Sequence, residues 1–162
     1  MKEALIVAIL HFSCVKQTSP PVDLFDSDAK NVISEFKGVL VKELKNAIDA
    51  GGPAHAITGC SQRTAQITQQ LSTNGLRLKR IGTRIRNART NTSTDAERQV
   101  LKNELTASAE WSGDVDGKRT YMRAIRIRAD LCLQCHGDKQ NIASEVAGKQ
   151  PANAIIVALT LP

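Results

Sequence analysis

The segment "CLQCH", Cys132 to His136, is the feature that most constrains what this chain can form. Two cysteines are separated by two residues, and a histidine follows the second cysteine directly. Three kinds of site use this spacing: part of a zinc site, a redox-active dithiol, and the attachment point of a c-type haem. Each makes a different demand on the fold, since zinc needs further ligands and a thioredoxin-like dithiol needs a helix start within a βαβ unit.

The remainder of the sequence favours haem attachment. A zinc site needs about four ligands, and outside the motif only Cys60, His55 and scattered carboxylates are available. No βαβ pattern surrounds the motif. In a c-type haem, Cys132 and Cys135 each form a thioether with a vinyl group, and His136 supplies one axial nitrogen to the iron. We therefore predict one covalently attached haem c.

Six of the 22 lysines and arginines lie in one run between Arg77 and Arg89, and the formal net charge of the chain is +6. Such a run can attract nucleic acid, anionic lipid or an acidic protein. No aromatic side chains interleave with the charges, so we expect no nucleic-acid partner. Arginine guanidinium groups pair well with carboxylates. We therefore assign Arg80 and Arg86 to the haem propionates.

The N-terminus is typical of an export signal. The apolar run at residues 4–12 is far shorter than the roughly 20 residues of a membrane span. It follows a lysine and precedes a polar stretch with prolines, which indicates a secretory signal over residues 1–14. "LHFSC" also resembles a lipoprotein box, so membrane attachment through a lipid on Cys14 stays open. We expect a periplasmic or other extracytoplasmic location, an exposed leader over residues 15–26 and a single domain over residues 27–162.

The second axial ligand has two candidates. The segment from Pro53 to Gly75 is predicted to be a helix, because Pro suits a first turn and Gly an exit. One stripe of this helix carries the positions expected to be buried: Ile57, Cys60, Thr64, Ile67 and Leu71. His55 lies about 140° around the helix from Cys60, so it should face solvent. The spacing alone leaves both Cys60 and Met122 open as ligands, since methionine serves in many c-type cytochromes.

The hydrophobic patterns indicate helices first and strands later. A first helix is expected to be capped by Ser27 or Asp28 and ended by Gly51, and residues 76–89 are expected to form a strand followed by an irregular basic turn. A further helix should start with a capping box at Thr94 and Glu97 and run to Trp111. Two later strands are expected, one placing Tyr121, Ile125 and Ile127 on one face and a closing one within 152–162. This order predicts an α+β fold with an antiparallel sheet.

Four separated stretches resemble one known family: residues 52–60, 79–87, 119–125 and 132–137. They are similar to the PAS-like, single-haem c-type cytochrome domain, formerly a domain of unknown function, found in exported proteins and in some membrane histidine kinases. The resemblance implies a PAS-like antiparallel sheet with N-terminal and flanking helices. It also implies that His136 and Cys60 are the two axial ligands of the iron. Tyr121 and Met122, in the third stretch, complete our set of haem-binding candidates.

This set of residues predicts a redox-responsive sensing or signalling protein with an unidentified redox or signalling partner. A periplasmic electron-transfer cytochrome c is the alternative. We do not expect an enzyme, because Cys60 would fill the position on the iron that a substrate needs. The sequence departs from the family at Ala88 and Ala124, where proline is usual, and in a shorter segment after Gly137.

Overall fold

The computed structural model describes residues 22–73, 75–82, 91–105, 108–126, 130–136 and 154–161. Its elements are α1 (Val22–Gln70), β1 (Arg77–Ile81), α3 (Asp95–Asn103), β2 (Glu110–Val115), β3 (Lys118–Arg126), α4 (Asp130–His136) and β4 (Ala154–Thr160). The predicted signal, Cys14, most of the predicted leader, Arg86, Ile127 and the segment after Gly137 lie outside the described residues.

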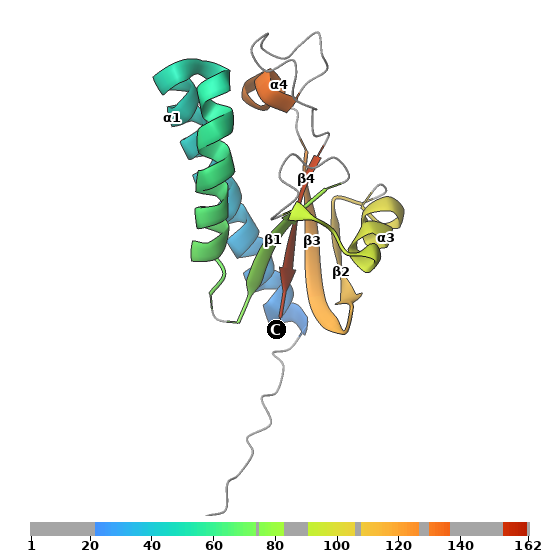
Figure 1. Cartoon of the computed structure of the whole chain (residues 1–162). Helices are drawn as coiled ribbons and strands as arrows, with labels where there is room; N and C mark the ends of the chain where they lie inside the picture. The colour runs from blue at the N-terminus through green and yellow to red at the C-terminus, as the bar shows by residue number, and fades with distance from the viewer. Residues whose placement is uncertain are drawn as a thin grey trace, which may run out of the picture.

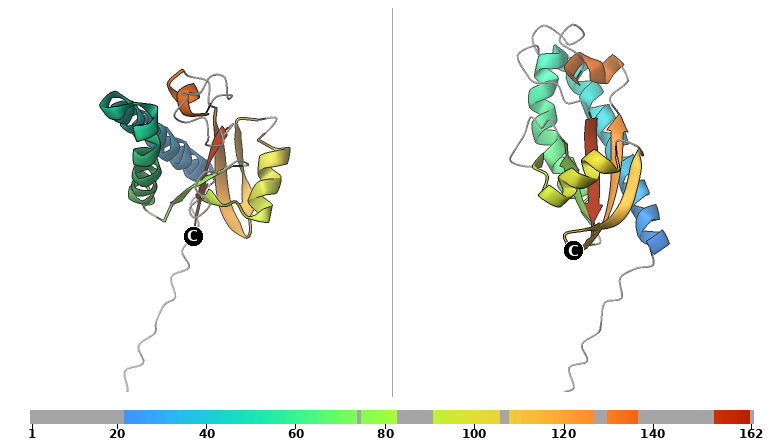
Figure 2. Two further views of the ribbon diagram at one scale, coloured as in Figure 1. Left: turned by 45° about the horizontal axis from the view of Figure 1, so that its top comes forward. Right: turned by 90° about the vertical axis from the view of Figure 1, so that its right-hand side faces the viewer.

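The four strands form one antiparallel sheet in the order β1-β4-β3-β2 (Figure 1). The last strand of the chain is therefore inserted between the first and the third. α1 covers one face of the sheet and α3 the other (Figure 2). The predicted α+β class with an antiparallel sheet is confirmed.

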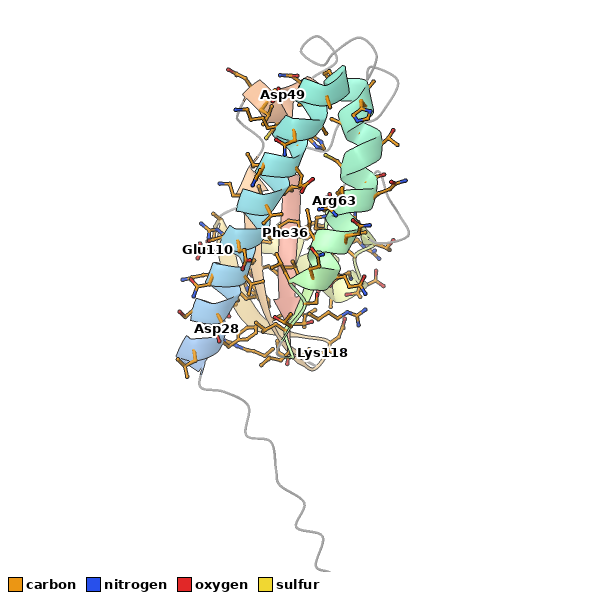
Figure 3. The ribbon with its side chains drawn as sticks, turned by 90° about the vertical axis from the view of Figure 1, so that its left-hand side faces the viewer. Asp28, Phe36, Asp49, Arg63, Glu110 and Lys118 are labelled. Carbon is orange, nitrogen blue, oxygen red and sulfur yellow. The ribbon has the colours of Figure 1, made fainter. Side chains whose placement is uncertain are left out.

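α1 is a hairpin of two helices. Its backbone leaves helical geometry at Gly51 (φ −170°, ψ 22°) and Gly52 (φ 73°, ψ −177°), and Pro53 opens the second half. The positive φ of Gly52 favours glycine, and proline fits a first helical turn, so this predicted boundary is confirmed. The two halves lie side by side (Figure 3), and Arg63 Nη2 on the second half lies 3.1 Å from Glu43 Oε1 on the first. No helix in the described ranges combines the length and the apolar character that crossing a membrane requires.

The first helix starts earlier than the sequence indicated. We expected a cap at Ser27 or Asp28 after an exposed leader, but the helix begins at Val22. Phe25 is only 2% exposed and Ala29 is fully buried, so the apolar stripe extends about one turn towards the N-terminus. The leader prediction is therefore wrong from Val22 onwards, because these residues are helical and Phe25 belongs to the core.

Two apolar clusters hold the layers together, one on each face of the sheet. The α1 side contains Phe25, Ala29, Ile33, Phe36, Ile67, Leu78 and Tyr121. The α3 side contains Ile81, Leu101, Leu105, Val115 and Met122. Successive residues of a strand point to opposite faces, so Tyr121 and Met122 are neighbours in sequence but belong to different clusters. Ile125 packs against the α1 side with Tyr121, as predicted.

The sequence interpretation missed β2. We expected a helix as far as Trp111, but α3 ends at Asn103 and the chain re-enters the sheet at Glu110. The turn from β2 to β3 consists of Asp116 and Gly117, with φ values of 54° and 76°. Positive φ at both residues is the geometry of a type I′ hairpin turn, for which Asp-Gly is a favoured pair. That dipeptide was the signal that could have revealed the hairpin.

α3 is fixed to β1 through one buried carboxylate. The predicted capping box is present: Glu97 N donates to Thr94 Oγ1 at 3.1 Å, and Thr94 N donates to Glu97 Oε2 at 2.7 Å. Lys79 Nζ also donates to both Glu97 oxygens, at 3.0 and 2.8 Å. Because Lys79 points to the α3 side, the alternation of the strand turns Arg80 to the α1 side.

Candidate functional site

The three residues of the "CLQCH" motif that carry chemistry lie on one short helix. Cys132, Cys135 and His136 stand at positions i, i+3 and i+4 of α4, so they share one face of it. α4 packs against α1 and lies near the bend of its hairpin, at one end of the sheet (Figure 1). Cys135 is 4% exposed, and Nδ1 of His136 is buried. The motif therefore faces protein rather than solvent.

Cys60 meets this face from the second half of α1. It is half-buried, and its carbonyl oxygen accepts a hydrogen bond from the Thr64 hydroxyl. Burial raises the pKa of the Cys60 thiol, and the neighbouring Cys135 raises it further. Arg80 acts in the opposite direction and Glu43 adds to the rise. Two cysteines from distant parts of the sequence are thus close enough to interact electrostatically.

Cationic side chains lie beside two of the thiols. Burial lowers the pKa of Arg80, and the nearby Cys60 opposes that change. Burial raises the pKa of Cys132, and Lys37 of α1 counteracts it. Within the described ranges, Arg80 forms no ion pair with a carboxylate. Cys60 and Cys132 are free thiols.

The structure separates other predicted site residues from this cluster. His55 is exposed, as its position on the helix predicted. Met122 is fully buried in the cluster on the α3 side, with Trp111 packed against the same cluster. Tyr121 is 2% exposed and lies on the α1 side, where burial and the adjacent Glu110 carboxylate raise the pKa of its hydroxyl. Met122 is therefore on the opposite side of the sheet from Cys60 and Arg80.

A cavity of about 250 Å³ lies elsewhere, between the start of α1 and the start of β1. Its lining residues are Phe25, Asp28, Asn31, Val32, Thr73, Leu76 and Leu161. None of the predicted site residues borders it. The chemistry-bearing cluster and the cavity are therefore separate features.

Comparison with known proteins assigns this arrangement to a family. The model of the Tll0287-like family matches residues 17–156. The chain belongs to the Tll0287-like family. The crystal structure of the cyanobacterial heme-protein Tll0287 superposes with a TM-score of 0.63 at 16% sequence identity, covering 89% of this chain and 97% of that one. At that identity the likeness shows a shared fold. No curated protein sequence matches the chain.

The family match and the shared fold confirm the resemblance that the four sequence stretches indicated. The side chains at this site of the Tll0287-like chain can be compared with the ligands that the predicted haem requires. Within the described ranges, no three or more His, Cys, Asp or Glu side chains converge as a bare metal ion would require. A haem iron needs protein ligands only above and below the ring, because the porphyrin nitrogens supply the others. Two thiols and an imidazole on one face of α4, with a third thiol on α1 near enough to interact electrostatically with Cys135, fit that requirement.

Sequence reasoning missed Lys37 and Glu43 as neighbours of the thiols. Both lie on the first half of α1, among other charged residues of similar spacing. Nothing local distinguishes them, because their nearness to Cys132 and Cys60 arises from the hairpin of α1 and the docking of α4. In this Tll0287-like chain the charges around the site are therefore set by tertiary packing and not by the local sequence.

Proposed function

We propose that this Tll0287-like protein is an exported c-type haem protein whose iron is held by His136 and Cys60, and that it responds to redox conditions as a sensor or signalling module. The observation that carries this proposal is the meeting of Cys60 with the Cys132–His136 face of α4. The crystal structure with the same fold is that of a heme-protein, which supports the choice of cofactor.

Four residues would each contribute a separate bond to one haem. The sulfurs of Cys132 and Cys135 would each form a thioether with a vinyl group, which would hold the haem at α4. His136 of the same helix and Cys60 of α1 would hold the iron, with a nitrogen and a sulfur respectively. The haem contributes a one-electron couple when bound. Because the two axial ligands come from different helices, a change at the Cys60 sulfur reaches α1 directly.

Ligation of the iron by His136 and Cys60 favours a redox switch over catalytic turnover. An anionic thiolate opposite an imidazole stabilises ferric iron more than ferrous iron. Ferrous iron would bind an anionic sulfur less tightly, and release of Cys60 would free the second half of α1 from the site. Cys60 also occupies the position that a substrate would need, and we therefore propose that the protein is not an enzyme.

Export and the partner are part of the same proposal. The short apolar run before Cys14 supports secretion to the periplasm or another extracytoplasmic location. A lipid on Cys14 would hold the protein at a membrane surface. The partner that receives the redox signal is then a protein at or beyond that surface.

An electron carrier is the second candidate, favoured by exposed lysines on the first half of α1. Lys37, Lys42 and Lys45 are exposed on its first half, and Lys37 lies beside Cys132. Exposed lysines near a haem attachment site would attract an acidic redox partner. A carrier keeps the same ligand pair in both oxidation states, whereas a switch changes it on reduction. Comparing ferric and ferrous spectra therefore separates the two candidates.

The test is to produce the mature protein in cells with a haem-maturation system and to compare it with Cys60→Ser. We expect pigment that resists extraction by acid acetone, and a ferric visible spectrum that changes in the variant. His55→Ala is the matched control on the same helix and should leave the spectrum unchanged, because His55 is exposed. Colourless protein, extractable pigment, or a wild-type spectrum in Cys60→Ser would contradict the proposal.

A further inference from the structure

Arg80 was assigned from the sequence to a haem propionate, and in the structure it interacts electrostatically with Cys60. We propose that Arg80 is a positioning residue whose guanidinium stands next to the Cys60 sulfur and holds it as a ligand of ferric iron. This inference rests on the proposed function and adds a residue that neither the attachment motif nor the ligand pair includes.

The register of β1 turns Arg80 towards Cys60. Leu78 is buried in the cluster on the α1 side, together with Ile67 of the second half of α1. Lys79 is bonded to Glu97 on the opposite side. Alternation along the strand then puts Arg80 on the same side as Leu78.

The position of Arg80 along β1 also agrees with that of Cys60 along the second half of α1. β1 runs back along the second half of α1 towards α4, antiparallel to that half (Figure 1). Arg80 lies about 6.6 Å beyond Leu78 along the strand. Cys60 lies about 10 Å beyond Ile67 along the helix, in the same direction. Leu78 and Ile67 belong to the same apolar cluster, and a long arginine side chain can span the difference between these two rises.

The electrostatics of the pair agree with this placement. Arg80 counteracts the rise in the pKa of Cys60, and Cys60 counteracts the fall in the pKa of Arg80. Glu43 opposes a charge on the Cys60 sulfur, and so does Cys135 while it is a thiol. Among the described residues, Arg80 is the cationic side chain that acts on Cys60 and favours an anionic sulfur there.

The experiment measures how readily imidazole displaces the Cys60 sulfur from ferric iron in the haem-loaded protein, at one fixed pH. The exchange breaks the iron–sulfur bond and forms an iron–nitrogen bond without electron transfer, and the released Cys60 sulfur takes up a proton from solvent at neutral pH. In Arg80→Gln we expect half-displacement at about a tenfold lower imidazole concentration than in wild type. Arg80→Met carries the same expectation if the glutamine variant does not accumulate.

Two controls separate charge from packing. Arg80→Lys keeps the cation with a different shape, so its imidazole response should fall between wild type and Arg80→Gln. Arg77→Gln removes an exposed cation from the same strand and should respond as wild type does. If lysine does no better than glutamine, the effect comes from packing and the proposal fails.

If Arg80→Gln and Arg80→Met both respond to imidazole as wild type does, the proposal is wrong. Arg80 is then again a candidate for binding the haem propionates. Failure of the proposed function is recognised separately. In that case Cys60→Ser keeps the wild-type ferric spectrum, and no sulfur is present for imidazole to displace.

Discussion

The ion pair between Lys79 and Glu97 leads to an asymmetric prediction, because its two members differ in access to water. The Glu97 side chain is 7% exposed and the Lys79 side chain 30%. The pair fixes α3 to β1, the strand that carries Arg80. Removing the lysine leaves a carboxylate in the interior, whereas removing the acid leaves an amine that reaches solvent. We expect the two variants to lose different amounts of stability.

The expected loss of stability depends on which side chain each variant leaves without its partner. Glu97→Gln keeps the capping box, since glutamine also serves at its third helical position. It loses the charge on two hydrogen bonds, and solvation of Lys79 offsets part of that loss, for a net cost of about 1 kcal/mol. Lys79→Met leaves Glu97 buried, with Thr94 N still donating to it at 2.7 Å. Leaving a buried charge without its partner lowers the free energy of unfolding by about 3 kcal/mol.

Urea unfolding of the haem-loaded protein, followed by circular dichroism at pH 7, measures both free energies. Lys79→Met should be less stable than Glu97→Gln by about 2 kcal/mol. Arg63→Ala is a reference, since it removes the exposed pair with Glu43 and should cost about 0.5 kcal/mol or less. Equal losses in the two variants, or a larger loss in Glu97→Gln, would refute the reasoning from burial.

Three further predictions concern other parts of the structure. Met122→Leu should leave the ferric spectrum unchanged, because Met122 lies on the α3 side; a changed ligand spectrum would bring it back as a ligand. Gly117→Ala should lower the free energy of unfolding by about 1 kcal/mol, since its φ is 76°, and no loss in urea unfolding would contradict the type I′ turn. Tyr121, Arg123 and Lys30 hold the pKa of Glu110 below its ordinary value, so Glu110 adds stability above its unfolded pKa that is lost as the pH falls through its folded pKa. Glu110→Gln should accordingly lose less stability than wild type between about pH 6 and pH 3, and parallel curves would contradict this.

Local chemistry allowed part of this structure to be predicted from the sequence. The capping box at Thr94 and the break at Gly52 depend on residues within one turn of each other. The exposure of His55 followed from helical periodicity alone. The family resemblance rested on short motifs with fixed order, and the family match confirmed it.

The rest depends on contacts between distant residues. Asp26 is held in α1 by Ser112 and Arg119, whose oxygen and nitrogen atoms lie 2.7 and 3.2 Å from its Oδ1. Neither partner is visible from the local sequence. β2 has a serine and a glycine in its middle, and it is a strand because β3 pairs with it.

The site shows the same division between local and tertiary information. Spacing identified Cys132, Cys135 and His136 as a unit, and they share a face of α4. Spacing could not separate Cys60 from Met122, because the difference between them is the side of the sheet on which each lies. The placement of Arg80 beside Cys60 likewise required the register of β1 against α1.

X-ray absorption at the iron edge of the ferric, haem-loaded protein tests the central claim most directly, because it detects sulfur among the atoms bound to iron. The account predicts one sulfur on the iron in wild type and none in Cys60→Ser. Iron bound only by nitrogen in wild type, or sulfur that persists in Cys60→Ser, would contradict ligation by Cys60.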